Sequence, residues 1–196
     1  MSEPAYTRLP VDERRSQLLD LGVKLFSAHS YDELSMAQIA REAGISKALL
    51  YHYFPGKQEF FEATIAQAAA ALGAITEPDP SLEPLEALTK SVDAFLSWID
   101  ANETAYLKLL QSAGSVPGVR VLIDDVRDRT AQRILEGIGA TDQPKSRAAA
   151  RGWLWYMDGV ILDWLEHRDI EREELRDLLV GSLGGALVAA ATPSGT

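Results

Sequence analysis

The sequence predicts an all-α protein of about nine helices. Apolar residues recur at the three- and four-residue spacing of an amphipathic helix along nearly all of the 196 residues. No segment alternates apolar and polar residues over the length that a half-buried strand needs. Apolar residues form 46% of the composition, which is enough for a substantial core and excludes the disordered class.

The first helix is expected over about residues 11–29. One apolar stripe on it comprises Leu18, Leu19, Gly22, Leu25 and Phe26. Two short helices should follow: Ser35 is placed to cap one over residues 36–43, and Ser46 to cap another over residues 47–53. Gly44 between them tolerates a left-handed turn. Two short capped helices joined by such a turn are typical of a helix-turn-helix.

The next helix should run over residues 57–74, after Pro55 and Gly56. Prolines around residues 76–83 mark the one obvious break in the pattern. Beyond this break we expect helices at about 82–101, 103–112, 117–138, 144–167 and 172–191. Pro117 and Pro144 mark two of their first turns.

The segment FSAHSYDELSMAQIAREAGISKALLYHYFPGKQEFFEATI resembles the DNA-binding domain of the TetR family of bacterial transcriptional repressors. The resemblance covers about residues 11–65. It is carried by Phe26, Tyr31, Ile39, Ala40, Gly44, Ser46, Lys47, Leu50, Tyr51, Phe54 and Lys57. It implies a DNA-binding domain over residues 11–65 and a helical ligand-binding and dimerisation domain over residues 66–192, acting as a ligand-responsive repressor on a palindromic operator.

The expected DNA-binding residues come from the caps, the second short helix and the start of the next helix. They are Ser35, Ser46, Lys47, Ala48, Leu49, Tyr51, His52 and Lys57. Lysine, serine and tyrosine groups can bind phosphates, whereas Ala48 and Leu49 can only make apolar contacts with thymine methyl groups. Lys47 could instead be a solvated lysine, Tyr51 a core residue, and His52 a solvent-facing histidine.

The charge distribution agrees with this assignment. Residues 1–60 hold seven basic and eight acidic residues, so nearly all of the net charge of −10 lies in the remaining chain. The sequence has no cysteine, no long apolar run and no secretory signal, which predicts a cytoplasmic protein. We expect no cofactor and no metal site, because the three histidines are scattered.

The last two predicted helices favour a homodimer. The segment 148–166 is apolar on nearly every side, and small residues recur on the last helix at Gly181, Ser182, Gly184, Gly185 and Ala186. Two such helices from each subunit can form an isologous four-helix interface. The alternative is a monomer core packed through small residues.

A small, largely apolar effector is the second expected partner. Its predicted site comprises Trp98, Tyr106, Trp153, Tyr156 and Asp158. The aromatic residues could equally be plain core. Asp158, a carboxylate inside an apolar helix, needs either a ligand group or an arginine from another helix.

An enzyme is the rival interpretation. Asp124, Asp125 and Asp128 form a D-D-x-x-D pattern, which can hold magnesium and a diphosphate as in terpene synthases. The interleaved Arg120, Arg127 and Arg129 favour a salt-bridged helix face instead.

Overall fold

In the computed structural model, which describes residues 11–141 and 143–192, every regular element is an α-helix. The helices are α1 (Val11–Ala28), α2 (Met36–Glu42), α3 (Lys47–Tyr53), α4 (Lys57–Ile75), α5 (Pro84–Ala101), α6 (Glu103–Ser115), α7 (Pro117–Gly137), α8 (Pro144–His167) and α9 (Arg172–Ala191). The all-α prediction is therefore confirmed. Only α6 departs by more than two residues from its predicted end, because the helix continues through Gly114 until Pro117 follows. None of the described helices has the length and apolar character needed to cross a bilayer.

The chain divides into two compact units. The N-terminal unit comprises the described residues up to Ala68 together with Thr104–Val119, and the C-terminal unit comprises Ala69–Glu103 and the residues from Arg120 onward. The predicted functional domains, 11–65 and 66–192, differ from these units in the placement of α6. Their boundary stays a prediction.

An aromatic cluster forms the core of the N-terminal unit. The Phe26 ring packs edge-on against Phe61 with centroids 4.4 Å apart, and the Phe54 ring packs edge-on against Phe60 at 4.9 Å. All four side chains are buried. They tie α1, the end of α3 and the first turns of α4 together, so the short helices α2 and α3 have a rigid support.

Helix α6 belongs to the N-terminal unit through a contact with the end of α1. The Lys108 Nζ atom donates a hydrogen bond of 2.5 Å to the carbonyl oxygen of Ala28. This carbonyl is in the last turn of α1, where carbonyl groups have no partner within the helix and a cation is favoured. Tyr106, Val116 and Val119 from the same stretch are buried.

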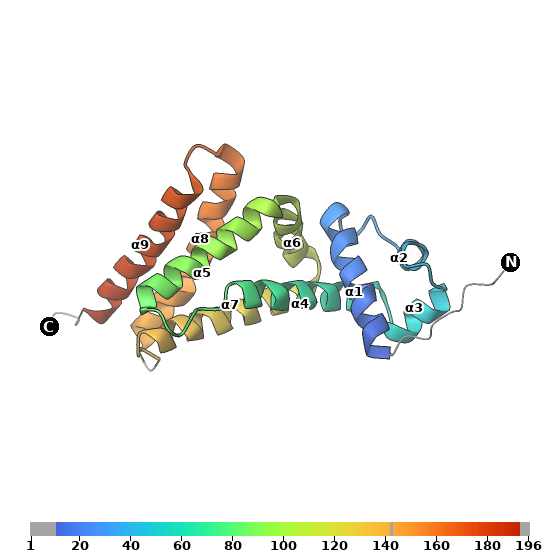
Figure 1. Cartoon of the computed structure of the whole chain (residues 1–196), viewed down its shortest axis with the longest axis horizontal. Helices are drawn as coiled ribbons and strands as arrows, with labels where there is room; N and C mark the ends of the chain where they lie inside the picture. The colour runs from blue at the N-terminus through green and yellow to red at the C-terminus, as the bar shows by residue number, and fades with distance from the viewer. Residues whose placement is uncertain (1–10, 142, 193–196) are drawn as a thin grey trace. The chain divides into compact units, whose positions relative to one another are not determined.

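The C-terminal unit is built around the pair α8 and α9. Figure 1 shows these two helices side by side, with α5 packed against α9. The Trp153 indole N–H on α8 donates to the carbonyl oxygen of Leu179 on α9 at 2.9 Å. Leucines 175, 179 and 183 of α9 are fully buried, and Leu96 and Ile99 of α5 are also fully buried.

Candidate nucleic-acid interface

Side-chain caps hold the two short helices of the motif in place. The Ser35 Oγ atom accepts a hydrogen bond from the Gln38 backbone N–H, and the Gln38 Oε1 atom accepts one from the Ser35 backbone N–H, which completes a capping box. The Ser46 Oγ atom accepts from the Leu49 backbone N–H at 3.1 Å. Gly44 has a φ of 64°, the left-handed conformation that the sequence predicted for the turn. Both predicted caps are therefore confirmed.

Helix α3 presents one polar face and buries the opposite one. Lys47, Ala48, Tyr51 and His52 are exposed, whereas Leu50 is fully buried. Tyr51 is 42% exposed, so it is a surface residue and not part of the core. The Lys47 Nζ atom lies 5.6 Å from the centre of the Tyr51 ring, which places both groups on the same face.

Leu49 and the Ser46 hydroxyl border this exposed face. Leu49 is half-buried. The Ser46 hydroxyl proton has no acceptor among the described residues, whereas the Ser35 hydroxyl donates to Gln38 Oε1 at 2.7 Å. Ser46 therefore keeps a donor for a phosphate oxygen, and Ser35 acts within the capping box. Their DNA contacts stay predictions.

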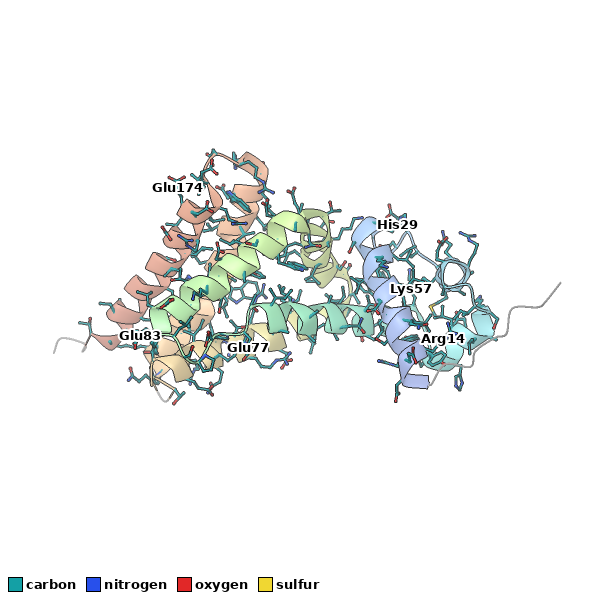
Figure 2. The ribbon with its side chains drawn as sticks, in the orientation of Figure 1. Arg14, His29, Lys57, Glu77, Glu83 and Glu174 are labelled. Carbon is teal, nitrogen blue, oxygen red and sulfur yellow. The ribbon has the colours of Figure 1, made fainter. Side chains whose placement is uncertain are left out.

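Lys57, labelled in Figure 2, is the first residue of α4 and connects this helix to the loop after α1. Its Nζ atom donates to the Tyr31 carbonyl oxygen at 3.0 Å and lies 4.0 Å from the centre of the Tyr31 ring. Burial, followed by the nearby carboxylates of Asp32, Glu59 and Glu62, raises the pKa of Tyr31 above 10. An ammonium group has three donors, so Lys57 can hold this loop and still reach a phosphate.

The two units differ in how their cations are paired. Among the described residues of the C-terminal unit, nine lysines and arginines have a carboxylate within 4.0 Å; they are Lys90, Arg120, Arg127, Arg129, Arg133, Arg151, Arg168, Arg172 and Arg176. In the described part of the N-terminal unit, only Arg41 has one, Glu42 at 3.8 Å. Cations without carboxylate partners are available to bind phosphates, and this unit contains the helix-turn-helix.

The predicted effector residues do not gather in one unit. Tyr106 is buried in the N-terminal unit, whereas the other four are in the C-terminal unit. Trp153 is buried between α8 and α9, where its indole bonds to Leu179, and Tyr156 is 42% exposed. Trp98 is half-buried on α5. The effector role of these residues stays a prediction.

Asp158 is paired with an arginine of another helix, which is one of the two alternatives that the sequence left open. The Arg127 Nη2 atom of α7 bonds to the Asp158 Oδ2 atom, and Nη1 bonds to Asp124 at 3.2 Å. The Arg127 guanidinium also lies 3.9 Å from the centre of the Trp155 ring. The sequence does not indicate that Arg127 and Trp155 belong to one cluster, because periodicity does not show which helices are neighbours.

A hollow of about 190 Å³ adjoins this cluster and is lined by Asp124, Arg127, Asp128, Arg151 and Trp155. The three aspartates of the D-D-x-x-D pattern are ion-paired there or nearby. Asp125 pairs with Arg129 at 2.7 Å, and Asp128 pairs with Arg151 at 2.8 Å. No group of three histidine, aspartate or glutamate side chains among the described residues could hold a metal ion. The salt-bridged helix face is the interpretation that the geometry supports.

Comparison with known proteins identifies the class that this fold and surface define. Residues 18–64 match the family described as "Bacterial regulatory proteins, tetR family". Residues 84–184, more than half of the chain, match "Tetracyclin repressor-like, C-terminal domain". The chain belongs to the TetR family of bacterial regulatory proteins, as its helix-turn-helix segment suggested.

Two curated relatives share part of the sequence. The transcriptional regulator HbdR of Aromatoleum sp. (strain CIB) is 33% identical over 136 residues, which are 66% of this chain and 58% of that protein. The transcriptional activator FasR of Mycolicibacterium smegmatis is 31% identical over 107 residues, 54% of this chain and 49% of that protein. The chain thus spans about half the length of the curated relatives it matches.

Two solved structures share the fold over nearly the whole chain. A tetR-family transcriptional regulator from Streptomyces coelicolor has a TM-score of 0.81 and 30% identity, covering 93% of this chain and 84% of that one. A TetR-like transcriptional regulator from Rhodococcus sp. RHA1 has a TM-score of 0.70 and 27% identity, covering 92% and 99%.

Proposed function

We propose that this chain is a sequence-specific DNA-binding repressor that binds a palindromic operator as a symmetric dimer and is released by a small apolar molecule. The observation that carries the DNA-binding part is the exposed polar face of α3, in a unit where Arg41 is the only cation with a carboxylate partner among the described residues. Lys47 and Tyr51 are on that face, and the Ser46 hydroxyl proton is uncommitted. Such a protein acts on DNA in the cytoplasm.

The dimer is supported by an unpartnered face on α8 and α9. Besides Trp155, which contacts Arg127, four exposed side chains of the pair are large and apolar: Tyr156 and Leu162 on α8, and Leu178 and Val188 on α9. Between the two α9 residues, Gly181, Gly184 and Gly185 have open space above them. Exposed large apolar side chains in such number are typical of protein interfaces. A two-fold axis would present two α3 helices to major grooves about 34 to 36 Å apart.

The effector is supported by membership of the family. A ligand that prefers the non-binding conformation by about 3 kcal/mol would weaken DNA binding more than a hundredfold. In this proposal helix α4 transmits the conformational change, because it starts at Lys57 in the N-terminal unit and ends in the C-terminal unit.

An enzymatic role has no comparable support. Each carboxylate of the D-D-x-x-D pattern has an arginine partner, so none is available for a magnesium ion without breaking an ion pair. We infer that this chain is a regulator and not a diphosphate-processing enzyme.

A selection experiment tests the proposal. The full chain would select binding sites from a randomised duplex library, and the selected duplex would be titrated at several salt concentrations beside a scrambled one. We expect a near-palindromic site, and an affinity for it that is at least about a thousandfold above that for the scrambled duplex. Equal affinity for both duplexes, or selection of no common sequence, would contradict the proposal.

A further inference from the structure

Arg15 on α1 lies at the C-terminal end of the recognition helix α3. Its guanidinium carbon is 5.2 Å from the centre of the Phe54 ring. Phe54 ends α3, since its backbone N–H donates to the Leu50 carbonyl oxygen in the last bond of the helix. Arg15 itself is exposed, whereas Phe54 is only 2% exposed. The guanidinium therefore lies on the surface, above the point where α3 ends and the turn to α4 begins.

Arg15 does not pair with the carboxylate that its own helix offers. Asp12 stands three residues earlier on α1, a spacing at which helical ion pairs form readily. No carboxylate of the described residues lies within 4.0 Å of the Arg15 guanidinium. A cation near a helix N-terminus is also opposed by the helix dipole. Among the described residues, these features leave the positive charge of Arg15 without a carboxylate partner, at the end of α3.

The dimensions of DNA place a phosphate near this position. Seven residues give α3 a length of about 10 Å, and the major groove is about 12 Å wide. When the first residues of so short a helix face the base edges, its last residues lie at the rim of the groove. The phosphates that border the groove are then within reach of a long side chain at the end of the helix.

We propose that Arg15 binds a DNA phosphate at the C-terminal end of α3, so that the DNA-binding surface extends from the helix-turn-helix onto α1. The inference depends on the proposed function, because it adds a contact to the same DNA complex. Arg15 would contribute affinity and register, but no base preference, since phosphate contacts carry no sequence information. The cation–π contact of the guanidinium with the Phe54 ring favours this position before DNA binds.

The test is the salt dependence of binding to the duplex selected by the wild-type chain. Each lost phosphate contact lowers the slope of log K against log salt by about 0.9, and a dimer loses two. Arg15→Gln should therefore lower the slope by about two and weaken binding roughly thirtyfold near 0.15 M salt. The ratio of affinities for the selected and scrambled duplexes should stay unchanged. Arg15→Lys, which keeps the charge, should keep the wild-type slope.

Lys24→Gln is the matched control. Lys24 is exposed on the same helix, about 13 Å further along its axis, and its loss removes the same charge. It should leave the slope unchanged. A wild-type slope in Arg15→Gln, or equal slope losses in Arg15→Gln and Lys24→Gln, would overturn the inference while leaving DNA binding itself intact. If the wild-type chain selects no duplex, the proposed function has failed instead. If Arg15→Gln is unfolded in a thermal melt, Arg15→Met replaces it, because its apolar stem can still cover Phe54 while the charge is lost: a slope lowered by about two supports the inference, and a wild-type slope overturns it.

Discussion

The side chain of Thr64 occupies the space that a side chain at Gly22 would need. A β-carbon built on Gly22 would overlap the Thr64 Oγ1 atom and lie 2.9 Å from Phe60 Cζ and 3.0 Å from Thr64 Cγ2. Thr64 is 1% exposed, and its hydroxyl donates to the Phe60 carbonyl oxygen at 2.8 Å. Helices α1 and α4 therefore cross at van der Waals contact at this point, and the absence of a side chain at Gly22 permits it.

Gly22→Ala should destabilise the N-terminal unit despite the higher helix propensity of alanine. Overpacking against a buried threonine and phenylalanine costs about 1 to 3 kcal/mol, which exceeds the gain of up to about 1 kcal/mol from replacing glycine in a helix. Urea unfolding of the full chain would measure the difference. Gly73→Ala on α4 is the control, because nothing lies within 4 Å of its added carbon, and it should be neutral or stabilising. Thr64→Ala should recover part of the loss in a Gly22→Ala background.

Substitutions at Lys57 and Lys47 should distinguish a lysine that also stabilises the fold from one that contributes only to DNA affinity. Lys57→Met removes the hydrogen bond to the Tyr31 carbonyl, so it should lower both the unfolding free energy, by about 1 kcal/mol, and DNA affinity. Lys47→Met should lower only DNA affinity, because its exposed ammonium has no hydrogen-bond acceptor among the described residues. Thermal melts and salt titrations of both variants measure the two effects. A stable Lys57→Met with wild-type binding would show that the ammonium has neither role.

Substitution of Leu49 tests whether apolar contacts determine which operator bases are preferred. It is half-buried on α3, so truncation to alanine should cost little stability but change which bases are preferred. Repeating the duplex selection with Leu49→Ala measures this preference, and Ala48→Gly on the exposed side is a comparison. Uniform weakening on every duplex, with no change of preferred bases, would show that Leu49 only supports the position of α3.

The elements and caps of this protein follow from local sequence, whereas its long-range pairings do not. Ser35, Gly44 and Ser46 act within four residues of their partners, so their roles could be predicted. The partner of Asp158 is 31 residues away on another helix. Helical periodicity shows that Asp158 lies inside an apolar helix, but it does not show that α7 brings Arg127 to it.

The sequence also does not predict which aromatic residues of α8 are buried. A helix that is apolar on nearly every side has several faces to bury, and its sequence does not assign them. Trp153 turns toward α9, while Trp155 is 59% exposed and Tyr156 is 42% exposed. Lys57 likewise binds Tyr31, 26 residues earlier, through a backbone carbonyl that no side-chain pattern reveals.

The exposed face of α8 and α9 should be required for dimerisation. Leu178→Glu places a charge on this face, where burial in an apolar interface would cost at least about 3 kcal/mol and weaken association over a hundredfold. Because Leu178 is 47% exposed in the single chain, the monomer should remain folded. Sedimentation at micromolar concentration measures the change. Leu85→Glu, at an exposed leucine of α5, is the control and should leave the dimer intact.

Glu33 should make the stability of the N-terminal unit depend on acid pH. Its carboxylate accepts a hydrogen bond from the Ser30 backbone N–H at 2.6 Å. This bond, then the Ser30 side chain, and then the charges of Lys108 and His29 hold the pKa of Glu33 below its ordinary value of 4.5. A carboxyl group whose pKa is lower in the folded state stabilises the fold above its unfolded pKa. That contribution is lost as the pH falls through the folded value.

Glu33→Gln removes the titrating group and weakens the bonds that hold the loop after α1. Thermal melts would be measured for the wild-type chain and for Glu33→Gln from about pH 7 to about pH 3. The two melting temperatures should therefore approach each other as the pH falls. The wild-type chain should melt higher above pH 4.5, and the difference should shrink progressively below that value, because the protonated wild-type carboxyl group resembles the amide. A difference that stays constant over the whole range would mean that Glu33 supports the loop without its charge. A difference that grows on acidification would contradict the lowered pKa itself.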